Sequence, residues 1–222
     1  MRILLTNLES NPNIGLYGFC NDHFCLLSKA VPKKQVNEVE KTLKVPVHQI
    51  TLCGTDLIGV FCAGNNHKII IPHICFDNEI HELKKLKIPF EVIESKHTAL
   101  GNLVLCNDNG AIVSKEMSDV IPSITKALNV KTIESSLAEL DNVGSLAVIR
   151  GVYGVCTKDI NNNEKHKAES LLKVRFTRGT VNYGSPYIKS GVLVNKNGMI
   201  IGESSTSIEM GILDEGLGFL EK

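Results

Sequence analysis

The residues with the clearest chemical potential in this chain of 222 residues are its seven cysteines. They are Cys20, Cys25, Cys53, Cys62, Cys75, Cys106 and Cys156. None belongs to a Cys-x-x-Cys pair, and most lie inside apolar runs such as Ile74–Phe76. Reduced cysteine in such a run behaves as a small buried hydrophobic residue, so we expect seven free thiols and no catalytic residues among them.

The segment from Cys20 to Cys25 also contains Asp22 and His23, which gives it a superficial similarity to a metal site. Zinc clusters use pairs of ligands at short spacing together with a second matching pair, and the sequence has no second pair. It has neither a Walker A sequence nor a Gly-x-Gly-x-x-Gly motif between a strand and a helix. We therefore expect a hairpin turn at Asn21–Asp22, with no metal and no cofactor.

These residues lie within a repeated pattern. An apolar residue followed by Gly opens a strand-like run at Ile14-Gly15, Ile58-Gly59, Leu100-Gly101 and Val143-Gly144, and Ser190-Gly191 opens a fifth. The intervals are about 42 to 47 residues, and in each unit a second apolar run follows the Gly before the chain turns polar. A regular interval of this length indicates five copies of one structural unit.

Each unit is predicted to contain strand, strand, helix and strand, in that order. Asn107–Gly110 and Asn195–Gly198 have the Asn and Gly residues of tight hairpins between the first two strands. The spacing of Val36, Val39 and Leu43 is typical of an amphipathic helix. We expect the helix of each unit to cover the outer face of its own three strands.

The fifth unit has no closing strand after its helix, and a strand-like segment at residues 2–6 precedes the first unit. We therefore predict one α/β domain over residues 1–222, closed into a ring because strand 1–8 completes the fifth unit. The repeats are expected at about 9–53, 54–95, 96–137, 138–181 and 182–222. Closure leaves no bare sheet edge, and an open stack of α/β repeats is the alternative.

Composition limits the function classes. Lys plus Arg and Asp plus Glu both number 24, so the net charge is zero. This argues against a protein that binds mainly by coating nucleic-acid phosphates. Aromatic residues are 5% and Trp is absent, which leaves few platforms for stacking bases. The sequence shows no signal peptide and no membrane-spanning run, so we expect a cytoplasmic monomer without a membrane partner.

A ring of five such units resembles the pentein fold of arginine deiminases and amidinotransferases. The resemblance implies an attacking Cys in the last unit, helped by a His and acidic residues. The fifth unit here has neither Cys nor His. We therefore predict a protein that is not an enzyme. The alternative is a guanidine-modifying enzyme with a relocated nucleophile, either Cys156 or Cys20.

Four motifs resemble those of the translation initiation factor 6 family, and they are distributed along the whole chain. They are Ala99–Asn102 followed by Cys106–Asp108, Gly64-Asn65 ahead of Ile69–Pro72, Gly179–Ser185, and Thr206–Glu209. The resemblance implies a pentein-type β/α-propeller that binds the large ribosomal subunit at its intersubunit face. There it would contact a ribosomal protein beside the sarcin–ricin loop and prevent association with the small subunit.

The ribosome-binding candidates are polar residues of these motifs and one neighbouring arginine. They are Asn65, Asn102, Arg178, Asn182, Tyr183 and Ser185. A structural role is the alternative for Asn102, because Asn beside Gly commonly bonds its own backbone. Arg178 lies near Lys173 and Arg175 in the sequence. We expect this basic group to supply a few contacts to adjacent ribosomal RNA, and a solvated strand end without such a role is the alternative.

Overall fold

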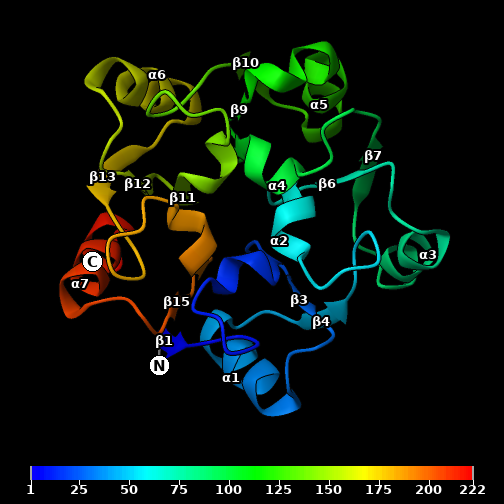
Figure 1. Ribbon diagram of the computed structural model, residues 1–222, viewed down its shortest axis with the longest axis horizontal. Coiled ribbons are helices and arrows are strands. Elements are labelled where there is room, and N and C mark those ends of the chain that lie inside the picture. Colours follow the sequence, from blue (N-terminus) through cyan, green and yellow to red (C-terminus); the bar gives the residue numbers. More distant parts are fainter. Residues whose placement is uncertain (1, 222) are drawn as a thin grey trace.

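A computed structural model describes residues 2–221 as a ring of five three-stranded sheets (Figure 1). Two cavities at the centre of the ring, which share Lys189 in their lining, form its central channel. Each sheet is called a blade, and the blades are numbered in chain order. Blade 1 is β2–β4 (Gly18–Cys20, Cys25–Ser28, Val47–Ile50), and blade 2 is β5–β7 (Ala63–Gly64, Ile69–Pro72, Phe90–Ile93). Blade 3 is β8–β10 (Val104–Cys106, Gly110–Val113, Lys131–Glu134), and blade 4 is β11–β13 (Ala147–Arg150, Tyr153–Thr157, Arg175–Gly179). Blade 5 is β14 (Val192–Val194), β15 (Met199–Gly202) and β1 (Ile3–Thr6). In every blade the first two strands are antiparallel and the third runs parallel to the second. The predicted five units, each with three strands, are confirmed.

The N-terminal strand closes the ring. Ile3 pairs with Met199, and the parallel register continues to Thr6, which pairs with Gly202. The flanking backbone extends the ladder, because Met199 N donates to Arg2 O at 2.8 Å. Figure 1 places both ends of the chain on the same side of the ring. The predicted completion of blade 5 by the first strand is therefore confirmed.

Five helices form the outer rim (Figure 1). They are α1 (Lys33–Leu43), α3 (Asp77–Lys85), α5 (Ile121–Leu128, preceded by the 3-10 turn η2, Lys115–Val120), α6 (Asn162–Leu172) and α7 (Ser207–Gly216). Pro122 lies in the first turn of α5, where a missing N–H costs little. Within residues 2–221, no helix combines the length and apolarity needed to cross a bilayer.

Each helix lies between two blades, whereas the prediction placed it on the outer face of its own three strands. One buried cluster joins Ile70 of blade 2 to Val113 and Ile124 of blade 3. Four similar clusters fill the other junctions. The physical reason is that β3, β6, β9 and β15, the middle strands of four blades, are buried at every residue. Both faces of these sheets need an apolar cover, and the neighbouring blade and its helix supply the second one.

The repeated glycines form short helical turns around the channel, where we had expected the start of a strand. These turns are η1 (Ile14–Leu16), α2 (Ile58–Phe61), α4 (Leu100–Leu103), η3 (Val143–Ser145) and η4 (Ile188–Gly191). They pack backbone to backbone, because a Cβ added to Gly59 would lie 1.8 Å from Gly15 O. A Cβ on Gly101 would lie 1.9 Å from Gly59 O. Only glycine leaves room for this approach.

The fifth turn has Lys189 at the equivalent position, so its register differs by two residues from the predicted Ser190-Gly191. A Cβ on Gly15 would meet Lys189 O at 1.9 Å, which continues the same contact around the ring. Ile188 is fully buried, like Ile14 in the first turn. The other four repeats are marked in the sequence by a glycine at this position, whereas the fifth turn has the long side chain of Lys189 there.

Candidate functional site

The central channel has two chemically different ends. The hairpin face is formed by the turns between the first two strands of each blade, around Asn21, Asn65, Asn107, Gly151 and Asn195. The loop face is formed by the connections between blades, such as residues 7–13, 51–57 and 180–187. A cavity of about 500 Å³ opens at the hairpin face and one of about 350 Å³ at the loop face.

Lys189 lines both cavities and separates them. Its side chain extends across the channel, and its Nζ donates to Gly101 O at 2.6 Å and to Gly59 O at 3.3 Å. Burial lowers the pKa of Lys189, while the nearby thiols of Cys62 and Cys106 act in the opposite direction. The side chain therefore ties blade 5 to the turns that precede blades 2 and 3.

The loop face presents Tyr183 on a tight turn. Asn182 and Tyr183 both have left-handed backbone conformations, with φ values of 49° and 65°. The bridge between Val181 and Ser185 closes the turn with two backbone hydrogen bonds of 2.8 and 3.0 Å. The Tyr183 side chain is 84% exposed. An apolar ring with a polar tip, held this far out, is well suited to contact a partner.

Glu209 of α7 holds this turn and was not among the predicted site residues. Its carboxylate accepts from Gly184 N at 2.8 Å, Tyr183 N at 3.2 Å and the Thr180 hydroxyl at 2.8 Å. Burial raises the pKa of Glu209, but the hydrogen bonds outweigh it, so that the net pKa lies below the usual range. Glu209 is only 5% exposed.

Sequence reasoning could have found Glu209 through the capping box. Glu209 follows the helix N-cap Thr206 by three residues, and the two residues bond each other's backbone N–H. Glu79 and Glu164 occupy the same position in α3 and α6. Each also accepts from the turn that opens its own blade, as Glu79 does from Cys53 N at 2.8 Å and Gly54 N at 2.9 Å. The acidic residue thus caps a helix and shapes a loop-face turn.

Asn102 lies in α4 and lines the loop-face cavity together with Asn13, Asn142, Ser185 and Tyr187. Its backbone N donates to Ala99 O at 2.9 Å. Its side chain is half-buried. Asn102 thus lies at the loop face, and both a partner contact and a structural role for it stay predictions.

The Asn182 side chain is engaged inside the molecule. Its Nδ2 donates to Pro12 O at 2.8 Å and to Asn13 Oδ1 at 3.3 Å. Its Oδ1 accepts from Ser205 Oγ at 3.2 Å. Asn182 therefore connects blade 5 to the loop that leads into blade 1, and the exposed side chain of this turn is that of Tyr183.

The structure places Asn65 at the opposite end of the ring from Asn102 and Ser185. Asn65 is 3% exposed, and its Oδ1 accepts from His67 N and Lys68 N inside the hairpin turn. Its Nδ2 donates to Leu128 O at the end of α5. Asn107 and Asn195 likewise satisfy the terminal carbonyls of α6 and α1. Asn65 has a structural role of this kind at the hairpin face, and its part in ribosome binding stays a prediction.

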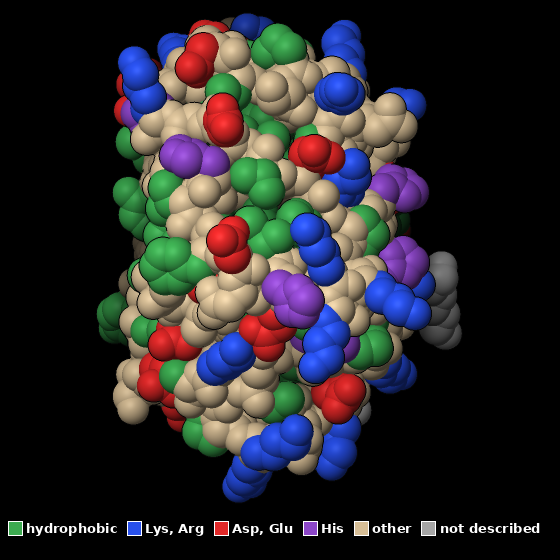
Figure 2. Space-filling model, turned by 90° about the vertical axis from the view of Figure 1, so that its right-hand side faces the viewer, with side chains coloured by type: hydrophobic (Ala, Val, Ile, Leu, Met, Phe, Trp, Pro, Cys, Tyr) green, Lys and Arg blue, Asp and Glu red, His purple; other side chains and the backbone are tan. Residues whose placement is uncertain are grey.

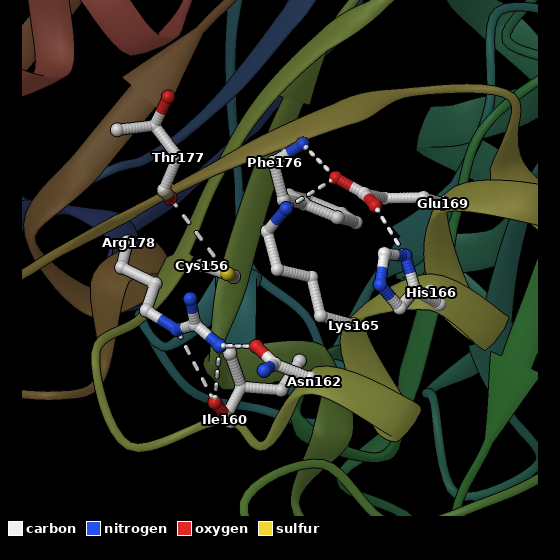
Figure 3. Close-up of polar contacts among 9 residues, drawn as sticks. All are labelled: Cys156, Ile160, Asn162, Lys165, His166, Glu169, Phe176, Thr177 and Arg178. Carbon is white, nitrogen blue, oxygen red and sulfur yellow. Dashed lines mark hydrogen bonds and ion pairs between the residues drawn. The ribbon is translucent and has the colours of Figure 1, made fainter.

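Arg178 lies on β13 with its guanidinium turned toward the connection ahead of α6 (Figure 3). It donates to Ile160 O at 3.0 Å and to Asn162 Oδ1 at 2.8 Å. Arg178 pairs with Cys156 toward the loop-face end of blade 4, whereas Arg175 pairs with Tyr153 at the hairpin end. Arg175 is also ion-paired with Glu221 at 3.1 Å. The predicted basic group is thus divided between the two ends of one strand.

The thiols of Cys156 and Cys20 lack the environment of a nucleophile. Burial raises the pKa of Cys156 to about 11 and that of Cys20 to about 12. Their Sγ atoms lie 3.7 Å from Thr177 O and 3.1 Å from Val194 O, respectively (Figure 3 for Cys156). Both thiols are therefore protonated at neutral pH, and the thiolate is the reactive form. The geometry does not favour the alternative of a relocated nucleophile.

Comparison with known proteins identifies the family of this chain from its sequence and the type of its fold from solved structures. Residues 3–216 match the model of the eIF-6 family. The translation initiation factor 6 of Staphylothermus marinus is 36% identical over 222 residues, covering 98% of each chain. That of Pyrococcus horikoshii is 34% identical over 227 residues, covering 99% of this chain and all of the relative.

Among solved structures, DDAH from Pseudomonas aeruginosa in complex with citrulline has a TM-score of 0.51 at 13% identity, over 74% of this chain and 68% of that one. The N-terminal domain of ArgZ, a cyanobacterial arginine dihydrolase, has a TM-score of 0.52 at 14% identity, over 87% and 73% of the two chains. At these identities the likeness shows a shared pentein-type fold alone.

Proposed function

This chain belongs to the eIF-6 family of translation initiation factors, and we propose that it binds the intersubunit face of the large ribosomal subunit and prevents the small subunit from joining. It acts in the cytoplasm as a binding protein without catalysis. The shared name of its relatives supports a role in translation. The contact surface is the loop face, and the partner it meets first is a ribosomal protein.

One observation carries this assignment. The loop face presents Tyr183, which is 84% exposed, on a turn held by Glu209, at the same end of the ring as the cavity lined by Asn102. Tyrosine is enriched at the energetically dominant positions of protein interfaces. A turn that is already held in place loses little conformational entropy on binding. The surface is therefore preformed for a protein partner.

The charge distribution supports a protein partner over a coat of RNA. Positive, negative and His side chains are interspersed on the side of the ring that faces the viewer in Figure 2. The net charge is zero. Broad phosphate binding depends on a basic surface, which this balance does not supply. Arg178, near the loop-face end of blade 4, provides a single contact to adjacent ribosomal RNA.

The ring suits a factor that acts by occupying space. The N-terminal strand closes it, and a buried apolar cluster fills each of its five junctions. A body of this kind does not deform when the small subunit approaches, because its interior is close-packed. Subunit joining is blocked by the volume of the ring, so no active site is needed.

Sedimentation with separated ribosomal subunits tests the proposal. We expect the parent protein to migrate with the large subunit only. Tyr183→Ala should weaken this binding by about tenfold or more, the range of an interface anchor. Asn102→Ala should also weaken it. Val152→Ala is the matched control, because Val152 is exposed at the hairpin face. Migration with the small subunit, or equal losses in Val152→Ala and Tyr183→Ala, would contradict the proposal.

A further inference from the structure

Two cysteines that are distant in sequence meet at the loop face. Cys53 lies in the turn closed by Leu52 and Thr55, with a left-handed φ of 56°. Cys75 lies between β6 and α3 and is 7% exposed. Their Sγ atoms are 3.4 Å apart, closer than ordinary sulfur van der Waals contact. The turn is the blade 2 counterpart of the one that presents Tyr183, since Glu79 holds it as Glu209 holds the other.

The two thiols have different acidities. The hydrogen bond from the Cys53 thiol lowers the pKa of Cys75, and the Cys53 backbone N–H acts in the same direction. The same hydrogen bond raises the pKa of Cys53. Cys75 is therefore the more acidic thiol of the pair, and Cys53 is the neighbour whose thiol donates a hydrogen bond to it. The thiols of Cys20, Cys62 and Cys106, by contrast, have pKa values raised by burial.

We propose that Cys53 and Cys75 are a redox site that a hydroperoxide converts into a reversible disulfide. The Cys75 thiolate attacks the terminal oxygen of the hydroperoxide and breaks its O–O bond. This step gives a sulfenic acid on Cys75 and releases an alcohol, or water when the oxidant is hydrogen peroxide. The Cys53 sulfur then attacks the Cys75 sulfur, and the hydroxyl group leaves with the Cys53 proton as water. Two thiols are oxidised and one peroxide is reduced.

The geometry makes the second step short. A disulfide bond is about 2.05 Å long, so the two sulfur atoms need to approach by little more than 1 Å. Cys53 is partly exposed and lies on a surface turn, so we expect Cys53 to make this movement. Glu79 bonds Cys53 N and Gly54 N, and Phe76 packs over Gly54, so the same movement rearranges this part of the loop face. The proposal is independent of ribosome binding.

Thiol counting and peptide mapping test the redox site. The full-length protein is treated with excess hydrogen peroxide, unfolded in a thiol-blocking reagent and digested. We expect the free thiols to fall from seven to five, with one disulfide joining the peptides of Cys53 and Cys75. A thiol reductant should restore all seven. Seven free thiols after peroxide treatment, or a disulfide between other cysteines, would overturn the proposal.

Two single variants test the order of attack and stay informative if disulfide formation affects folding. In Cys53→Ser, Cys75 has no resolving thiol, so a sulfenic acid should accumulate on Cys75 and react with dimedone. In Cys75→Ser, Cys53 should remain a free thiol. Cys25→Ser is the control, because its thiol is fully buried, and the Cys53–Cys75 disulfide should still form there. Dimedone labelling of Cys53 in Cys75→Ser, with an inert Cys75 in Cys53→Ser, would overturn the assignment of Cys75 as the attacking group.

Discussion

Two ionisable side chains, Glu209 and Lys189, are held by hydrogen bonds inside the molecule and have shifted pKa values. Glu209 accepts from the turn that presents Tyr183, and Lys189 donates across the channel. For each, the shifted pKa links the free energy of unfolding to pH over a definite window. Both links can be measured.

Glu209→Gln replaces a carboxylate, whose two oxygens both accept hydrogen bonds, with an amide that has only one acceptor oxygen. The amide NH₂ group then faces backbone N–H donors of the turn and cannot accept from them. We expect the free energy of unfolding to fall by about 2 to 3 kcal/mol at pH 7, because charged hydrogen bonds are lost in a buried place. The folded-state pKa is depressed. The carboxylate's contribution is therefore present above its unfolded pKa and lost as pH falls through the folded one.

Urea unfolding from pH 7 down to pH 3 measures this effect of Glu209. The difference between parent and Glu209→Gln should shrink as the pH falls through the acidic range. Glu215→Gln is the control on the same helix, since Glu215 is exposed. A difference that stays constant with pH would show that Glu209 acts by shape alone.

Lys189→Met removes a cation whose folded-state pKa burial has lowered. Between that lowered pKa and the ordinary value of 10.5, the unfolded chain binds more protons at this group than the folded one. Lys189 therefore makes the free energy of unfolding rise with pH in this window. We expect the parent to gain stability relative to Lys189→Met between pH 7 and pH 10.5. Urea unfolding with Lys84→Met as an exposed control checks this, and an unchanged difference would contradict it.

At the scale of elements, the short turns around the channel depend on glycine more than any helix or strand does. Gly59 abuts the carbonyl of Gly15, and Gly101 abuts that of Gly59. The contact is between backbones, so no side-chain movement can relieve an added methyl group. Gly211, in the exposed middle of α7, has nothing within 4 Å of an added Cβ.

This contrast predicts opposite signs for the same substitution. Gly59→Ala should lower the free energy of unfolding by about 3 kcal/mol or more, or prevent folding, because it overlaps a backbone oxygen at 1.8 Å. Gly211→Ala should raise it by up to about 1 kcal/mol through helix propensity. Thermal and urea unfolding of both variants measure the difference. Equal effects would show that the turns do not pack this tightly.

At the scale of the whole molecule, stability depends on a junction made by the two ends of the chain. β1 gives blade 5 its third strand, and Arg2 binds Phe219 O at 2.9 Å and Asp214 at 2.8 Å. We expect deletion of residues 1–7 to expose the edge of β15, to lower the melting temperature and to promote association. Light scattering and calorimetry measure both. A truncated chain that melts with the parent and stays monomeric would contradict ring closure as a source of stability.

The zero net charge predicts how binding to the large subunit depends on salt. A binder with 6 to 10 phosphate contacts loses about a thousandfold or more in affinity between 50 and 200 mM salt. We expect a much gentler loss here, and Arg178→Ala should lower the slope by about one. Arg175→Ala is the control, because Arg175 is ion-paired at the other end of the strand. A steep parent slope that Arg178→Ala leaves unchanged would favour an RNA-coating mode.

The repeats, the hairpin turns, the closing strand and the family could all be inferred from the sequence. Strand and helix patterns and the Asn-Gly turns are local, because they depend on periods of a few residues. The position of the closing strand followed from counting strands per unit. The register of the fifth turn could not be inferred in this way, because Lys189 occupies the position that is a glycine in the other four turns. Its backbone oxygen makes the same close contact, with Gly15, that the glycines make around the ring.

Only the tertiary structure decided which residues meet. It placed Asn65 and Asn102 at opposite ends of the channel, seated the helices between blades, and brought Cys53 within 3.4 Å of Cys75. It also showed that Glu209 holds the turn of Tyr183. These relations join residues far apart in the chain, and they depend on how the faces of neighbouring blades pack. A repeat of one sequence pattern specifies each blade, whereas the packing between blades determines the two faces of the ring.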